Sequence, residues 1–144
     1  MLTGKKVMVS STYRDLIEER TAVALTIAGQ GMVPLFMESD AAIPNRGILE
    51  NSLKMVAEAD IYLVIVSNYR YGQTVVDPAL NPDGCSVTER EFDEAEKLGK
   101  PICAFLLDDD VPPPSVKAAQ DEAGNADKLA KFRARAEDPK RISK

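Results

Sequence analysis

Six consecutive apolar residues, Ile61–Val66, constrain the fold of this chain more than any other segment. Most of them are β-branched or aromatic, which favours a strand, and no polar residue interrupts them to mark a solvated face. Strands that are buried on both faces lie inside parallel sheets, and such sheets need helices above and below to cover them. The sequence therefore predicts a central parallel strand in an α/β fold.

The rest of the chain alternates between strand-like runs and helical spacing. Further strands are predicted at Lys6–Ser10, Met32–Met37 and Ile102–Leu107. Pro34 indicates that the second of these lies at a sheet edge, because proline cannot donate to a ladder. Helices are predicted at residues 14–28, 48–56 and 86–98. This order predicts a flavodoxin-like, doubly wound parallel sheet of four to five strands, with helices on both faces.

The composition changes after residue 110. A run of three prolines is followed by the Ala- and Lys-rich segment Asp127–Glu137, which is typical of one more polar helix. A chain of 144 residues has the size of one globular domain. We expect residues 1–110 to form the domain core. Residues 111–144 are expected to be a Pro-rich linker and a polar helix that continues into further elements of a longer protein.

Charge and hydropathy argue against nucleic acid and membranes as partners. The net charge of −5 argues against nucleic acid, which requires clustered Lys and Arg to replace counterions. The longest apolar runs are far shorter than the roughly 20 residues of a membrane helix, and the N-terminus lacks a signal-peptide pattern. The sequence therefore predicts a cytoplasmic protein without a nucleic-acid or membrane partner.

The chain contains no histidine, which removes Ser-His-Asp, Cys-His and HExxH chemistry. Cys85 and Cys103 form no CxxC motif, so we expect two free thiols and no metal site. If the chain is an enzyme, carboxylates and binding geometry must carry the reaction.

Polar side chains follow the first and third predicted strands. Ligands of open α/β sheets bind outside the carboxyl ends of the strands, where helix N-termini can receive anions. The connection after the third strand is also longer than the roughly 12–15 residues of ordinary loops, which is typical of functional loops. These groups predict a nucleotide site. The candidate nucleotide-binding residues are Ser10, Ser11, Thr12, Arg14, Tyr69, Arg70, Tyr71 and Gly72.

These residues also have structural interpretations. Polar groups at strand ends are commonly solvated, and Tyr69 and Tyr71 are more often packing residues than ligand-stacking ones. Arg14 and Arg20 lie on a helix with several acidic residues, so ordinary ion pairing is expected for both.

Glu91 is the candidate catalytic residue. At about 100° per residue, it falls within the helix face that carries Phe92, Ala95 and Leu98. A carboxylate that points toward the sheet must be paired, neutralised or used, because burying an unpaired charge is costly. Catalysis and structural pairing with an arginine, either Arg14 or Arg70, remain equally open.

A neighbouring glutamate has a different role available. Ser86-x-x-Glu89 fits a capping box, in which a serine and a glutamate satisfy each other's amide groups at the start of a helix. We assign Glu89 to that role. Thr88-x-x-Glu91 fits the same pattern if the helix begins two residues later.

Three segments together resemble a known family. They are Val7–Leu16 with Glu18-Glu19-Arg20, Ser67–Gly72, and Ser86–Ala95 with Gly99-Lys100-Pro101. In order and spacing they resemble a TIR-like family that is still labelled a domain of unknown function. Its members commonly precede NACHT-type ATPase or repeat modules. The resemblance covers roughly residues 5–137.

The resemblance implies a role for Glu91. TIR domains with NAD glycohydrolase activity and nucleoside deoxyribosyltransferases both carry a glutamate on the corresponding helix, followed by a pattern like Glu91-x-x-x-Ala95. It implies that Glu91 stabilises the sugar as the nicotinamide bond of NAD breaks, with NAD as the substrate and no bound cofactor.

At the level of the whole protein, the resemblance implies an effector of prokaryotic antiphage defence that self-associates and has downstream domains. A non-catalytic TIR-like module for nucleotide binding or self-assembly is the alternative. Nucleoside deoxyribosyl transfer is a third interpretation.

Overall fold

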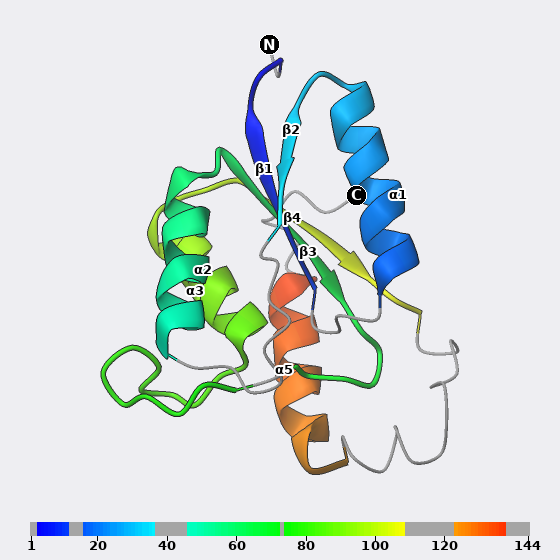
Figure 1. The fold of residues 1–144 in the computed structure, drawn as a ribbon. Coiled ribbons are helices and arrows are strands. Elements are labelled where there is room, and N and C mark those ends of the chain that lie inside the picture. Colours follow the sequence, from blue (N-terminus) through cyan, green and yellow to red (C-terminus); the bar gives the residue numbers. More distant parts are fainter. Residues whose placement is uncertain (1–2, 12–15, 37–45, 73, 109–122, 138–144) are drawn as a thin grey trace.

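The computed structural model describes residues 3–11, 16–36, 46–72, 74–108 and 123–137. Its centre is an all-parallel sheet with the strand order β2-β1-β3-β4 (Figure 1). The strands are β1 (Lys6–Ser11), β2 (Val33–Leu35), β3 (Ile61–Val66) and β4 (Ile102–Leu106). The apolar run is thus an interior strand and the proline-containing strand lies at an edge, as predicted.

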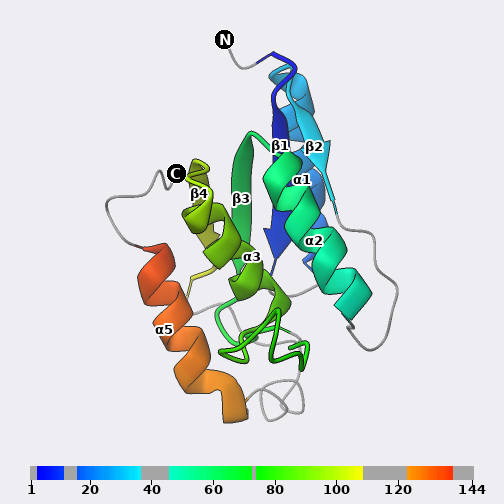
Figure 2. The ribbon, with the colours of Figure 1, turned by 90° about the vertical axis from the view of Figure 1, so that its left-hand side faces the viewer.

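Helices cover both faces of the sheet, which confirms the predicted doubly wound α/β fold. They are α1 (Ile17–Gly29), α2 (Arg46–Glu58), α3 (Val87–Lys97), the short 3-10 helix η1 (Ala123–Asn125) and α5 (Ala126–Ala136). Helix α1 packs on one face, whereas α2, α3 and α5 lie on the other (Figure 2). None of the helices within the described ranges is both long and apolar enough to cross a membrane.

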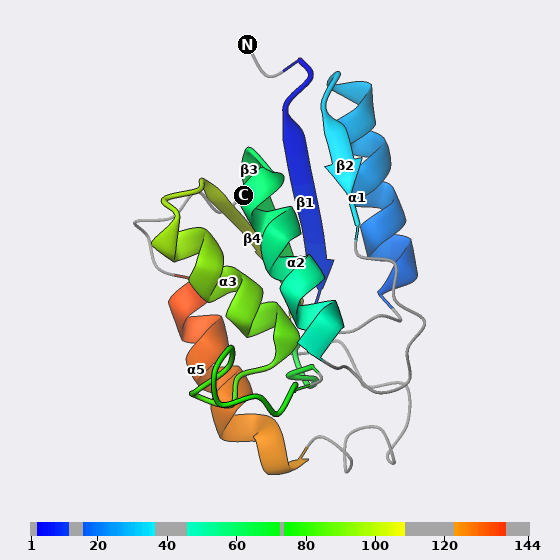
Figure 3. The same ribbon diagram turned by 60° about the vertical axis from the view of Figure 1, so that its left-hand side comes forward.

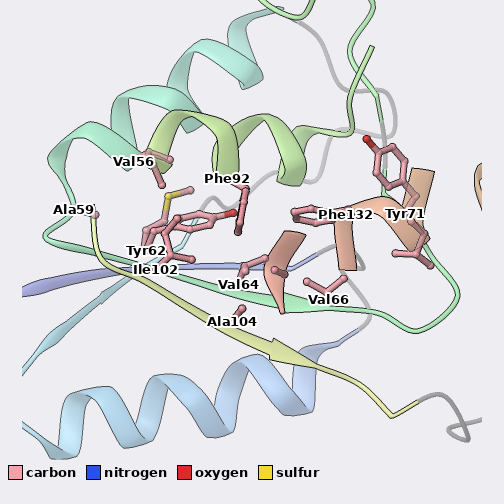
Figure 4. Packing of buried hydrophobic residues seen from close by; sticks show 14 residues of the cluster. Val56, Ala59, Tyr62, Val64, Val66, Tyr71, Phe92, Ile102, Ala104 and Phe132 are labelled. Carbon is pink, nitrogen blue, oxygen red and sulfur yellow. The ribbon is translucent and has the colours of Figure 1, made fainter. Parts of the chain in front are cut away.

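The larger part of the core lies between the sheet and α2, α3 and α5 (Figure 4). Phe92 is at its centre, and its ring makes edge-to-face contacts with Tyr62 at 6.4 Å and Phe132 at 5.3 Å between centroids. Burying an aromatic side chain of this size contributes roughly 1.5–3 kcal/mol. This layer carries Glu91 on the same helix as Phe92, so the core fixes the position of the carboxylate.

Helix α5 is more deeply integrated than the sequence predicts. We expected a polar helix beyond a linker, but Leu129, Phe132 and Ala136 are buried in the larger core. These residues are three and four positions apart, which places them on one side of a helix among many Lys and Arg residues. The domain boundary at residue 110 remains a prediction, while α5 and the sheet share one core.

The smaller core lies between the sheet and α1 and includes Val7, Val9 and Ile65. Because side chains alternate along a strand, Met8 and Ser10 of β1 face the opposite layer. The carboxyl ends of the strands and the N-terminal ends of α1 and α3 lie at the same end of the molecule (Figure 3). Candidate site residues from distant parts of the sequence therefore gather at this end.

Candidate functional site

Glu91 points inward from α3 toward the end of β1. The hydroxyl of Ser10 donates a hydrogen bond to Oε1 of Glu91 at 2.6 Å. Both side chains are buried, with 3% of Glu91 and 7% of Ser10 exposed. The predicted inward orientation of Glu91 is therefore observed. Among the described residues its hydrogen-bond partner is a hydroxyl and not Arg70, whereas pairing with Arg14 stays open because Arg14 lies outside those residues.

Burial changes the acidity of this carboxyl group. Loss of solvent raises the pKa of Glu91 from 4.5 to about 7, and hydrogen bonds from Ser10 and Ser52 partly oppose that rise. Ser52 comes from α2 and is itself buried. Within the described ranges no cation contributes to this pKa. A carboxyl group that exchanges its proton near neutral pH can act as a general acid or base.

Tyr62 of β3 adds a phenol beside the carboxylate. Its hydroxyl donates to the backbone carbonyl of Thr88 at 3.3 Å. Burial first, and then the negative charge of Glu91, raise the pKa of Tyr62 well above its usual value. The phenol consequently stays protonated. Two strands, β1 and β3, and one helix, α2, thus contribute hydroxyl groups around Glu91.

The sequence interpretation missed Ser52 and Tyr62. Ser52 lies three residues after Leu49 and four before Val56, and both of these are fully buried. A polar residue on that apolar stripe was a signal that the serine points inward. Tyr62 gave no such signal, because a tyrosine in an apolar strand is ordinarily a packing residue.

The start of α3 forms a modified capping box. Ser86 is the N-cap, and its hydroxyl accepts from the amide of Glu89 at 3.1 Å, as predicted. The reciprocal half passes through Tyr71. The amide of Ser86 donates to the Tyr71 hydroxyl at 3.0 Å, and this hydroxyl donates to Oε1 of Glu89. The helix therefore begins at Val87, so Thr88 is not its cap.

Arg135 of α5 neutralises the carboxylates on the outer side of α3. Its guanidinium donates to Glu89 at 2.6 Å, to Asp93 at 2.6 Å and to Glu96 at 2.5 Å. It also lies 5.0 Å from the ring centroid of Phe92. Glu89 is thus a buried carboxylate with a cationic partner. Within the described ranges Glu91 is contacted by hydroxyl groups instead, which distinguishes it from the ion-paired Glu89.

The loop after β3 is built around Ser67. The buried Ser67 hydroxyl accepts from the amides of Tyr69 at 3.2 Å and Arg70 at 3.1 Å. The Arg70 guanidinium lies 5.8 Å from the ring centroid of Tyr69. Gly72 has a φ of 106°, a conformation that favours glycine. Tyr69, Arg70 and Gly72 therefore belong to one ordered turn at the carboxyl end of β3.

A second arginine of α5 holds the ends of two strands. Arg133 donates to the carbonyl of Ser67 at 3.1 Å and to the carbonyl of Leu107 at 2.9 Å. These carbonyls follow β3 and β4. The start of the loop after β3 is accordingly fixed from both sides, by its own serine and by α5.

The remaining part of the long connection is closed by Asn81. Its amide group donates to the carbonyls of Val75 at 2.9 Å and Cys85 at 2.8 Å, and its oxygen accepts from the Cys85 amide at 3.1 Å. Thr74 and Ser86 pair in an antiparallel bridge where the segment begins and ends. The cysteines Cys85 and Cys103 are free thiols, as predicted.

The structure separates the predicted nucleotide-binding residues into groups. Ser10 contacts Glu91, whereas the carbonyl of Ser11 accepts from the Thr88 hydroxyl at 2.8 Å. Tyr71 is buried and contacts Glu89 rather than Glu91. The assignment of Ser10, Ser11, Tyr69, Arg70, Tyr71 and Gly72 to a nucleotide site stays a prediction. Thr12 and Arg14 lie outside the described residues.

Fold and site together define an α/β domain with a buried glutamate near the carboxyl end of a parallel sheet. Residues 6–144 match a family described as a domain of unknown function (DUF4062), and the chain belongs to this family. No curated protein matches the chain. The family description names no activity, so the function has to be argued from the site.

Proposed function

We propose that this chain is a TIR-like nucleotide-processing domain that cleaves the N-glycosidic bond of NAD, with Glu91 as its catalytic carboxylate. The observation that carries the proposal is the environment of Glu91, which is buried beside Ser10 and has no cationic partner within the described ranges. Burying a carboxyl group without a cation to offset its charge reduces stability and is typical of functional sites.

The proposed reaction uses Glu91 in two ways. As nicotinamide leaves with the electron pair of the glycosidic bond, positive charge develops on the sugar, and a nearby carboxylate stabilises it. Water then adds to the anomeric carbon and passes a proton to Glu91. The products are nicotinamide and ADP-ribose, and the proton is released to solvent. A pKa of about 7 suits this transfer at neutral pH.

The closed environment of Glu91 implies an activation step. With only 3% of the residue exposed, substrate must displace some of the side chains that cover the carboxyl group. We propose that self-association supplies this opening, as expected for a TIR-like effector of prokaryotic antiphage defence that is coupled to NACHT-type or repeat domains.

The second candidate is a non-catalytic TIR-like module for nucleotide binding or self-assembly. The same burial of Glu91 favours it, because a carboxyl group satisfied by Ser10 and Ser52 can serve only to position α3 against β1. Under this proposal, nucleotide binds without being cleaved.

One experiment separates the candidates. The purified protein, concentrated or fused to an oligomerising domain, is incubated with NAD, and nicotinamide release is followed by chromatography. We expect Glu91→Gln to abolish release, since it keeps the shape of the side chain and removes its charge. Glu94→Gln, on the same helix and paired with Arg90 at 3.2 Å, is the matched control and should stay active.

Each outcome bears on one candidate. Activity that survives Glu91→Gln would refute the catalytic role. Binding of unchanged NAD, measured by calorimetry and retained in Glu91→Gln, would support the non-catalytic module instead.

A further inference from the structure

Arg20 has no ionic partner among the described residues and lies near the end of the sheet that carries the candidate site. It lies in the first turn of α1, and its guanidinium carbon is 5.3 Å from the ring centroid of Phe36, which follows β2. Its Nε atom is buried and has no hydrogen-bond acceptor within the described part of the chain. The ordinary ion pair expected for Arg20 from the sequence is therefore not present in that part.

An unbonded arginine nitrogen is costly to bury, because it loses water without gaining another acceptor. Stacking on Phe36 fixes the plane of the guanidinium and leaves its edges to donate hydrogen bonds. Phosphate oxygens match this planar arrangement of donors. The neighbouring acids Glu18 and Glu19 are exposed, and helical geometry directs them about 200° and 100° away from Arg20.

The position of Arg20 relative to the strands also matters. Leu35 of β2 pairs with Met8 of β1, so Phe36 and Ser10 both lie beyond that pairing toward the carboxyl end. Arg20 approaches this end from the α1 face, and Glu91 approaches it from the α3 face. Both side chains therefore lie at the carboxyl end of the sheet, where adjacent strands are roughly 4.8 Å apart, and a ligand that contacts both has to lie across the end of β1 and displace part of the cover over Glu91.

We propose that Arg20, held against Phe36, binds the phosphate groups of a nucleoside diphosphate whose sugar extends toward Glu91. The inference rests on the proposed function for the sugar and its contact with Glu91. Phosphate binding at Arg20 stands on the guanidinium that is stacked on Phe36 and on its Nε, which has no acceptor in the described part of the chain, and it is testable without any cleavage reaction.

The test is calorimetric titration of the full chain with ADP, with inorganic pyrophosphate and with adenosine, which lacks phosphate. We expect Arg20→Met to weaken ADP and pyrophosphate binding about tenfold or more and to leave adenosine binding unchanged. Arg20→Lys should recover part of the affinity, because it restores the charge without the planar fork. Lys131→Met removes an equal charge from an exposed site on α5 and should bind like the wild type.

Folding is monitored by thermal unfolding of each variant. Should Arg20→Met fail to fold, Phe36→Leu provides the second variant, and we expect it to weaken pyrophosphate binding several-fold by releasing the guanidinium. The inference is overturned if the wild type binds neither ADP nor pyrophosphate, or if Arg20→Met binds both like the wild type. Intact NAD alongside Arg20-dependent ADP binding would overturn only the proposed function.

Discussion

The Ser10 hydroxyl and the Glu91 carboxylate meet at 2.6 Å although 81 positions separate them in the sequence. Ser10 is the penultimate residue of β1, and Glu91 lies in the second turn of α3, which packs on the same sheet. Their hydrogen bond therefore forms only once β1 and α3 are docked. The titration of Glu91 consequently reports on the packed state of this layer.

The first prediction concerns pH. The folded pKa of Glu91 is about 7, compared with an ordinary value of 4.5. The folded state thus binds the proton more tightly than the unfolded state does. This contributes to the free energy of unfolding in full below about pH 4.5, and the contribution is lost as the pH rises through about 7. The loss amounts to about 3 kcal/mol. Glutamine does not titrate, so Glu91→Gln should gain stability relative to the wild type over this interval.

Urea unfolding of both proteins at about pH 5 and about pH 8 measures this difference. All other titrating groups are common to the two proteins and cancel in the comparison. A stability difference that is the same at both pH values would show that Glu91 keeps an ordinary pKa.

The second prediction concerns the modified capping box. Tyr71→Phe removes the hydroxyl that links the Ser86 amide to Glu89, which leaves a buried donor and a buried acceptor unmatched. We expect a loss of about 1–3 kcal/mol in unfolding free energy. A double-mutant cycle with Glu89→Gln measures the coupling, and additive effects would argue against the link.

The third prediction concerns the contact between α5 and α3. Arg135→Met leaves Glu89 buried without its cation and should destabilise the protein by about 1–3 kcal/mol, a range reduced for the partial exposure of the arginine. Arg135→Lys should restore less than half of the loss, because one ammonium group cannot reproduce three directed contacts. Lys131→Met, exposed on the same helix, is the control. Equal melting temperatures for all three variants would contradict the prediction.

The fourth prediction concerns the segment closed by Asn81. Asn81→Ala removes the two donated hydrogen bonds and the accepted one, so residues 74–86 should lose their compact conformation and become the preferred site of proteolysis. Limited digestion followed by mass spectrometry locates the cleavage. Asp83→Ala changes an exposed residue in the same segment and should be cut no faster than the wild type.

Local sequence patterns were sufficient for the fold and for the orientation of Glu91. The apolar run of β3 and the proline of β2 predicted the interior and edge strands, because burial and ladder hydrogen bonding depend directly on residue type. The same helical spacing placed Leu98 on the buried face of α3, and this prediction was wrong, because Leu98 is 43% exposed. Helix α3 ends at Lys97 and the chain turns at Gly99 with a φ of 69°, so Leu98 leaves the buried face.

The partners of the candidate site were harder to predict. Ser10 and Ser11 were grouped, although strand alternation directs adjacent side chains to opposite faces. The contact of Arg135 with Glu89 joins residues 46 positions apart, and no local pattern encodes such a pairing. Helix α5 was interpreted as polar because its three buried residues are outnumbered by charged ones.

The hydrogen bonds from Arg133 to the carbonyls of Ser67 and Leu107 couple the position of α5 to the carboxyl ends of β3 and β4. The same Ser67 orders the backbone of Tyr69 and Arg70 through its hydroxyl. A displacement of α5 would therefore alter the hydrogen bonds of Arg133 and, through Ser67, the backbone of the turn after β3. One arginine thus links the position of the C-terminal helix to the backbone at the carboxyl ends of β3 and β4.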